Sequence, residues 1–323
     1  MRGFLATGIL LAAAFGACGE EGAPAEPPPP APAEFPKPKR GQSLADLRTD
    51  LGVEGLVLAP SVSVLQADER TRFGFGLFDA TRAQVSDAQA GVYVAREGDA
   101  RVRGPFPARY ESLEVEPEFQ SEGAALAPDA AASVYTTDLP FDGPGTYQVL
   151  AAVALGNEIV PATPAAPLEV VRDSKVPDVG ERAPRISTPT VASTGGRIEE
   201  IDTRVPPVAE LHETDFADVA GREPTILLFA TPALCQSQVC GPVVDVMLQA
   251  KVAHEGDDVT FIHMEVFEDN LVEKGYRPQL EAFNLRTEPW LFALDRDGRI
   301  VDRIEGAFGV GELERAIDAA ISG

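Results

Sequence analysis

Apolar stretches with two different spacings alternate along residues 201–323. Continuous apolar runs at 225–229 and 259–267 predict two buried strands, and apolar residues at helical spacing between them predict a helix over 239–254. Further predicted elements are helices at 212–220 and 278–284, a hairpin at 290–304, and a last helix with an apolar stripe of Leu313, Ala316, Ile317, Ala320 and Ile321. This alternation predicts an α/β domain with helices on both faces of a sheet.

Residues 51–172 have a different pattern. Short apolar or alternating runs recur between Gly, Pro and Asp, and no stretch keeps helical spacing, which predicts an all-β sandwich. The segment 143–149 resembles the tyrosine corner of immunoglobulin-like domains, with Val149 where antibody domains carry a cysteine. Because this part contains no His, Cys or Met, we expect an Ig-like spacer or protein-contact module without chemistry of its own.

The first fifty residues predict export and tethering. Arg2 and the apolar stretch 4–15 have the form of a signal peptide that is too short to cross a bilayer. The stretch ends in Phe-Gly-Ala-Cys, which resembles a bacterial lipobox, so we predict a lipoprotein signal over 1–18 and lipidation of Cys18. An ordinary signal peptide cut near the same place is the alternative. Residues 19–50, rich in Pro, Ala and Glu, predict a disordered tether.

The composition narrows the range of partners. The chain has 323 residues, enough for about two domains, and a second linker is predicted over 173–200. A net charge of −24 argues against nucleic acid and against an anionic membrane surface as partners, so membrane contact is expected through the lipid anchor alone. No phosphate loop, dinucleotide fingerprint or Ser-His-Asp set is found, and no cofactor is predicted.

Cys235 and Cys240 follow the strand predicted at 225–229 and precede an apolar helix. Backbone N–H groups at a helix start favour the thiolate. With Cys18 lipidated, the two are the only cysteine pair in an exported, disulfide-permissive compartment. Five residues of regular helix advance about 7.5 Å, whereas a disulfide needs Cα atoms about 4.4–6.8 Å apart. The two can therefore bond only if Cys235 lies in the loop and the chain curls before the helix begins.

With these features, the region 201–323 resembles the thioredoxin superfamily. The resemblance depends on the strand–cysteine–helix junction at 225–254, on Thr-Glu-Pro-Trp at 287–290 before a strand, and on the closing hairpin and helix. In that family the proline is cis and lies against the cysteine pair, a place that Pro289 occupies. The spacing C-x4-C departs from the two intervening residues of thioredoxins. The strand also lacks the buried acid that thioredoxins place behind their cysteines, and Glu223 is the nearest candidate.

The resemblance implies a lipid-anchored thiol–disulfide oxidoreductase outside the cytoplasm, on the cell membrane or outer membrane. Cys235 would be the nucleophile and Cys240 the resolving thiol, while Pro289 would shape the substrate groove. The expected partners are exported protein thiols or disulfides and an electron donor. Two alternatives stay open: a non-catalytic scaffold lipoprotein with a structural disulfide, and a Sco-like copper-handling protein. No metal ligand is predicted, since His263 and Met264 are adjacent on a strand and face opposite ways.

Overall fold

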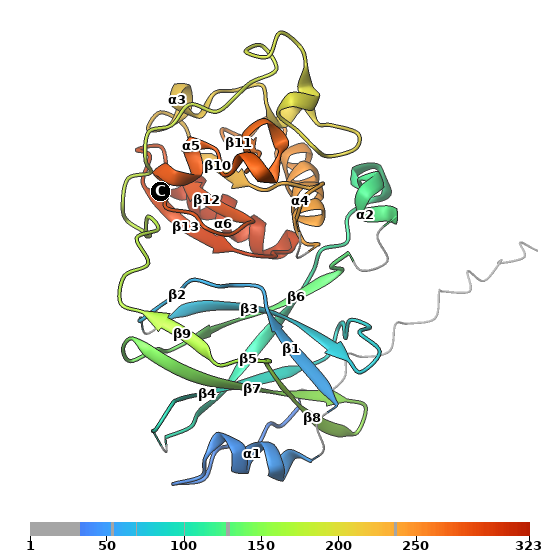
Figure 1. Cartoon of the computed structure of the whole chain (residues 1–323), viewed down its shortest axis with the longest axis vertical. Coiled ribbons are helices and arrows are strands. Elements are labelled where there is room, and N and C mark those ends of the chain that lie inside the picture. Colours follow the sequence, from blue (N-terminus) through green and yellow to red (C-terminus); the bar gives the residue numbers. More distant parts are fainter. Residues whose placement is uncertain (1–32, 53–54, 69, 100, 127–129, 236–237) are drawn as a thin grey trace, which may run out of the picture. The chain divides into compact units, whose positions relative to one another are not determined.

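The computed structural model describes residues 33–323 except 53–54, 69, 100, 127–129 and 236–237 (Figure 1). The predicted lipobox with Cys18 and the first part of the predicted tether lie outside the described residues. The range 19–50 that was predicted as a disordered tether contains a helix, α1 (Leu44–Leu51), which begins with a capping box between Ser43 and Asp46. None of the helices in the described part is both long enough and apolar enough to span a membrane.

The strands of the first half form one closed barrel. They are β1 (Leu56–Pro60), β3 (Thr71–Asp79), β4 (Ala90–Arg96), β5 (Arg103–Ser112), β6 (Ser133–Leu139), β7 (Gly145–Leu155) and β8 (Glu158–Thr163). The hydrogen-bonded order is β7-β4-β5-β6-β3-β1-β8, and β7 also pairs with β8, which closes the ring. Two further strands extend it, β9 (Leu168–Val171) on β7 and β2 (Leu65–Gln66) on β9. The strands thus form a single closed barrel, which corrects the expected two-sheet sandwich.

Apolar side chains at every second position of the strands fill the interior of the barrel. Phe73, Phe75 and Leu77 lie at every second position of β3, and all three are fully buried in one apolar cluster. The Tyr147 hydroxyl donates to the carbonyl of Gly143 at 2.9 Å, which is the hydrogen bond of a tyrosine corner. Between β5 and β6 the chain forms η1 (Pro117–Phe119) and α2 (Glu122–Leu126).

The second half contains a four-stranded sheet in the order β11-β10-β12-β13. β10 (Thr225–Phe229) and β11 (Thr260–Met264) are parallel, and β12 (Trp290–Leu294) and β13 (Ile300–Glu305) follow in antiparallel pairing. The parallel strands are joined by α4 (Cys240–Ala253), and the chain closes with α6 (Val310–Ser322). This order and these directions confirm the thioredoxin-like arrangement predicted for residues 201–323.

Helices cover both faces of this sheet, which explains its continuous apolar strands. Ile226 and Leu228 of β10 pack in one cluster with α4 and α6. Leu227 and Phe229 pack in another, with the short helices α3 (Phe216–Val219) and α5 (Pro278–Ala282). All four side chains are fully buried. A strand that is buried on both faces has no polar alternation, so its sequence is an uninterrupted apolar run.

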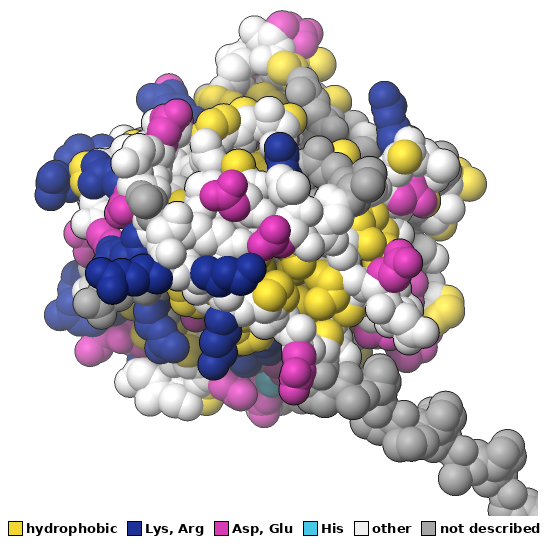
Figure 2. All heavy atoms as spheres, turned by 90° about the horizontal axis from the view of Figure 1, so that it is seen from below, with side chains coloured by type: hydrophobic (Ala, Val, Ile, Leu, Met, Phe, Trp, Pro, Cys, Tyr) yellow, Lys and Arg dark blue, Asp and Glu magenta, His cyan; other side chains and the backbone are white. Residues whose placement is uncertain are grey.

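The surface carries charges of both signs. Figure 2 shows one face on which acidic side chains are interspersed with Lys and Arg, with apolar side chains between them. The net charge of −24 therefore does not produce a uniformly acidic surface on that face.

Candidate redox site

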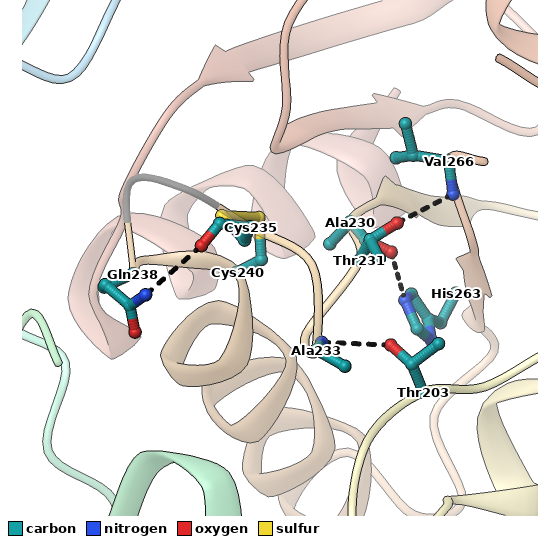
Figure 3. Close-up of a disulfide and its surroundings, with 9 residues drawn as sticks. All are labelled: Thr203, Ala230, Thr231, Ala233, Cys235, Gln238, Cys240, His263 and Val266. Carbon is teal, nitrogen blue, oxygen red and sulfur yellow. Dashed lines mark hydrogen bonds between the residues drawn. A yellow bond between two sulfur atoms is a disulfide. The ribbon is translucent and has the colours of Figure 1, made fainter. Parts of the chain in front are cut away.

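Cys235 and Cys240 form a disulfide at the junction of β10 and α4, with Cα atoms 5.9 Å apart. Cys235 lies in the loop, and α4 begins at Cys240 with Pro242 in its first turn (Figure 3). Gln238 has a positive φ of 58°, and its N–H donates to the carbonyl of Cys235 at 3.4 Å. The chain thus curls before the helix begins, as the bond between the two cysteines requires. The sulfur at the helix N-terminus is therefore that of Cys240.

The disulfide is buried where the cysteine loop packs against the barrel region. Cys235 is 6% exposed and Cys240 is 0% exposed, so Cys235 is the more accessible sulfur. Both belong to an apolar cluster that also contains Leu113 and Val134 of the barrel region. The connection between β5 and β6 lies against the cysteine loop, where the Ala131 N–H donates to the carbonyl of Gln238 at 3.3 Å. The barrel region therefore covers part of the cysteine pair.

A carboxyl group lies beside the two sulfurs. One Glu288 carboxylate oxygen and the Sγ atoms of Cys235 and Cys240 all lie within 4.8 Å of one another. Burial raises the pKa of Glu288 to about 7, and a hydrogen bond from the Thr231 backbone offsets only part of this effect. Glu288 Oε2 has no hydrogen-bond partner among the described residues. The group can therefore hold or release a proton near neutral pH, next to the disulfide.

Glu288 takes the place for which the sequence suggested Glu223. Glu223 instead accepts a hydrogen bond from the Thr260 hydroxyl at 2.9 Å, at the start of β11. The Glu288–Pro289 peptide bond is cis, and Pro289 is buried directly before β12. Glu288 lies outside the strand that leads to the cysteines, which is where the thioredoxin resemblance implied such an acid. The available sequence signal was its position directly before Pro289.

A second buried acid lies behind Glu288. Glu265 is 1% exposed, and burial raises its pKa. Its Oε1 accepts the N–H of Thr203 at 2.7 Å. The Thr231 hydroxyl accepts from the N–H of Val266 at 3.0 Å, and Thr231 lowers the pKa of both Glu265 and Glu288, which offsets part of the effect of burial. Thr231 therefore links the acid beside the sulfurs to one further inside the domain.

The histidines do not join the cysteines. His263 Nε2 donates to the carbonyl of Ala230 at 2.9 Å, and its ring lies apart from the disulfide in Figure 3. The residues that bring possible ligand atoms together at the sulfurs are Cys235, Cys240 and Glu288. His263 instead lies close to His212 and Asp202. Among the described residues, no histidine therefore lies in the group formed by the two cysteines and Glu288.

The chain shows only limited similarity to known proteins. No protein-family profile matches the chain. No curated protein matches it either. Among solved structures, a chain described as a thiol:disulfide interchange protein DsbE from Chlorobium tepidum aligns with a TM-score of 0.32 at 17% identity, covering 45% of this chain and 99% of that one.

Two further solved structures align in a similar way. A thioredoxin-family thiol:disulfide interchange protein from Chlorobium tepidum TLS gives a TM-score of 0.32 at 18% identity, covering 45% of this chain and 98% of that one. The C-terminal domain of ZirS gives a TM-score of 0.17 at 13% identity, covering 49% of this chain and 96% of that one. The thioredoxin-like assignment therefore depends on the strand order, and the site on its own geometry.

Proposed function

We propose that this protein is a thiol–disulfide oxidoreductase whose reactive pair is Cys235 and Cys240. The observation that supports this most directly is a protonatable carboxyl, Glu288, within 4.8 Å of both sulfurs at the start of α4. A purely structural disulfide does not exchange protons, so it does not require a protonatable group beside its sulfurs. Thiol–disulfide exchange does, because each step produces or consumes a thiolate.

The proposed cycle begins with the reduced pair. The Cys235 thiolate attacks a substrate disulfide, forms a mixed disulfide and releases one substrate thiolate, which takes up a proton. Cys240, deprotonated by the Glu288 carboxylate, then attacks Cys235 Sγ and releases the second substrate thiolate. The substrate gains two electrons and two protons, and the Cys235–Cys240 bond forms again. A dithiol electron donor returns the pair to the reduced state.

The surroundings of the reaction are also part of the proposal. Lipidation of Cys18 would hold the protein outside the cytoplasm, on the cell membrane or the outer membrane. Its substrates there would be exported protein thiols and disulfides. The buried position of the disulfide, with Cys235 at 6% exposure, favours extended or loosely folded substrate segments over compact ones.

The test is catalysed reduction of insulin by dithiothreitol with the full chain. We expect the wild type to accelerate the reaction and Cys235→Ser to lose all of the acceleration. Cys240→Ser should instead accumulate a mixed disulfide with the substrate, visible by mass spectrometry, because the resolving thiol is missing. Glu223→Gln, a conservative change of an acid away from the sulfurs, is the control. A wild-type rate equal to that of dithiothreitol alone would refute the proposal.

One observation favours a structural disulfide as the second candidate. The pair packs with Leu113 and Val134 of the barrel region, so it also joins the two halves of the molecule in one core. A structural bridge is expected to have a reduction potential below about −300 mV. A catalytic pair that accepts electrons from a dithiol donor has to lie above that value. Equilibration with glutathione or dithiothreitol, followed by alkylation and mass spectrometry, separates the two.

A further inference from the structure

Three side chains converge in the interior at the edge of the sheet. His212 Nε2 lies 3.2 Å from His263 Nδ1 and 3.6 Å from Asp202 Oδ2, and His263 Nδ1 lies 3.9 Å from Asp202 Oδ1. All three residues are at most 2% exposed. The redox proposal makes no use of them.

These separations suit a small divalent cation. Zinc binds imidazole nitrogen at about 2.0–2.1 Å and carboxylate oxygen at about 2.0–2.2 Å, usually in a tetrahedron. Ligand atoms of such a tetrahedron lie roughly 3.3–3.6 Å from one another. The two nitrogens lie 3.2 Å apart, and each lies 3.6–3.9 Å from an oxygen of Asp202, which is close to this spacing. Two imidazoles and one carboxylate are a donor set that zinc accepts.

The hydrogen bonds around the cluster orient these groups as ligands. A carbonyl can only accept, so His263 Nε2 carries the proton that it donates to Ala230, and its Nδ1 accepts the hydrogen bond from His212 Nε2. Metal-bound histidines usually donate their other ring N–H in this way. A bound cation would displace the proton on His212 Nε2 and take both nitrogens as ligands. The Asp202 carboxylate is held by the N–H groups of Arg204 at 2.9 Å and Val208 at 2.7 Å.

A further buried acid, Glu265, lies near the cluster. Glu265 follows His263 by two residues, so both side chains extend from the same side of the chain, and both line one small pocket with His212. Glu265 Oε2 is buried without a hydrogen-bond partner among the described residues. Arg277 also lines this pocket, but its guanidinium donates to the carbonyls of Phe267 and Glu200 and to Asn270 Oδ1. A bound cation would favour the ionised form of Glu265, so that two carboxylates balance its charge.

We propose that Asp202, His212 and His263 form a binding site for a divalent cation of the zinc class. Asp202 and His212 come from the segment before α3, whereas His263 comes from β11, the edge strand of the sheet. The bound ion would therefore fasten residues 202–212 to the sheet edge. Its three ligand residues are distinct from Cys235, Cys240 and Glu288, on which the proposed redox function rests.

The test is a titration of the full chain with Zn²⁺ alone and with Co²⁺ alone. The disulfide is kept oxidised, and Cys18 is replaced by Ser, so that no thiol can bind metal. We expect one equivalent of Zn²⁺ by calorimetry and a higher Tm when it is bound. Co²⁺ should give the visible absorption of a tetrahedral site without a thiolate charge-transfer band. ¹⁵N-labelled histidine should show shifts at two of the three imidazoles.

Variants assign the binding to this cluster. Asp202→Asn and His212→Gln keep most of the local hydrogen bonding, and we expect each to weaken Zn²⁺ binding by about 100-fold or more. His254→Ala is the matched control, because this third histidine pairs with Asp257 and Glu314 elsewhere. Circular dichroism and metal-free Tm values show whether each variant folds. The proposal is wrong if the folded wild type binds neither ion, or if binding survives His212→Gln and is lost in His254→Ala.

Discussion

Glu288 is the residue whose protonation has the largest expected effect on the chemistry, because its pKa is raised to about 7 beside the two sulfurs. A carboxylate deprotonates the resolving thiol only when it is ionised, so the rate of resolution should rise with pH through about 7. We predict that Glu288→Gln slows insulin reduction by about 100-fold at pH 7 and removes this inflection. Stopped-flow measurement of mixed-disulfide resolution between pH 5 and 9 checks it.

The same carboxyl also makes stability depend on pH. The pKa of Glu288 rises from 4.5 to about 7 on folding, so the folded protein holds the proton more tightly than the unfolded chain. The resulting stabilisation is complete below pH 4.5 and is lost as pH rises through about 7. We predict that the wild type loses roughly 3 kcal/mol of unfolding free energy over this range through Glu288, and that Glu288→Gln does not.

Urea unfolding of the oxidised protein at pH 5 and pH 8 measures this difference. Burial also raises the pKa of Asp302, to about 6, but that group is present in both proteins and cancels when they are compared. An equal loss of stability in wild type and Glu288→Gln would contradict the prediction.

The sequence predicted the cysteines but not the acid beside them. Cys235 and Cys240 are recognisable because a buried strand, a loop and a helix follow one another in the chain, and local spacing is enough to place them together. Glu288 reaches the sulfurs through the pairing of β12 with β10, which joins residues some sixty positions apart in the chain. The local pattern around Glu288 offers only its position directly before Pro289, and it does not encode that strand pairing.

At the scale of the elements, a buried ion pair between Asp245 and Arg204 attaches α4 to its surroundings. Asp245 Oδ1 lies 2.8 Å from Arg204 Nε, and Asp245 Oδ2 accepts the N–H and hydroxyl of Ser121, each at 2.9 Å. Arg204 also donates to the carbonyl of Phe119 at 2.7 Å. The pair thus joins α4 to the segment before α3 and to the barrel connection. Burial outweighs the attraction of Arg204 and raises the pKa of Asp245, so this carboxylate depends on its partner.

We predict that Arg204→Met costs about 3–5 kcal/mol, because it leaves a buried carboxylate without its cation. In an Asp245→Asn background the same change should cost about 2 kcal/mol less, since an amide keeps the bonds to Ser121 and needs no cation. Denaturant unfolding of the four proteins in this cycle gives the coupling energy. Arg197→Met, at a pair that is 64% and 52% exposed, is the control and should change stability by less than about 1 kcal/mol. Additive effects of the two core substitutions would contradict the prediction.

The type of each helix or strand could be predicted where the apolar residues formed a continuous run or a regular spacing. In residues 201–323 every predicted strand and helix range contains an element of the predicted type, because each has either a continuous apolar run or a stripe at helical spacing. The barrel strands were also predicted as strands, but their pairing was not. The ring closes through β7 and β8, and short alternating runs do not encode which strands become neighbours.

In the whole molecule, the barrel and the thioredoxin-like region form one compact unit over residues 33–323. Arg72 of β3 binds Glu312 of α6 through Nε at 2.6 Å and Nη2 at 2.8 Å, and it donates to the carbonyls of Glu305 and Ala307. The sequence suggested two domains with a linker between them. It could not indicate this interface, because the contacting residues are more than two hundred positions apart.

Two glycines let the backbones meet at this interface. A Cβ at Gly306 would lie against the Ser61 carbonyl, and one at Gly309 would lie against the Ser112 carbonyl. Gly309 has an ordinary φ of −97°, so a substitution there tests the contact without backbone strain. Ser112 directly precedes Leu113, which packs in the cluster that contains the disulfide. A methyl group at residue 309 should therefore displace the part of the barrel that covers Cys235 and Cys240.

We predict that Gly309→Ala lowers the unfolding free energy by about 1–3 kcal/mol through overpacking. It should also speed reduction of the disulfide by dithiothreitol severalfold, because Cys235 becomes more exposed. Thiol release monitored over time measures the rate, and calorimetry measures the stability. Gly143→Ala, which places its methyl where the nearest atom is 3.9 Å away, is the control for adding a methyl group to the barrel. If Gly309→Ala is destabilised but its disulfide is reduced at the wild-type rate, the barrel does not control access to the site, and substrates must reach Cys235 from another side.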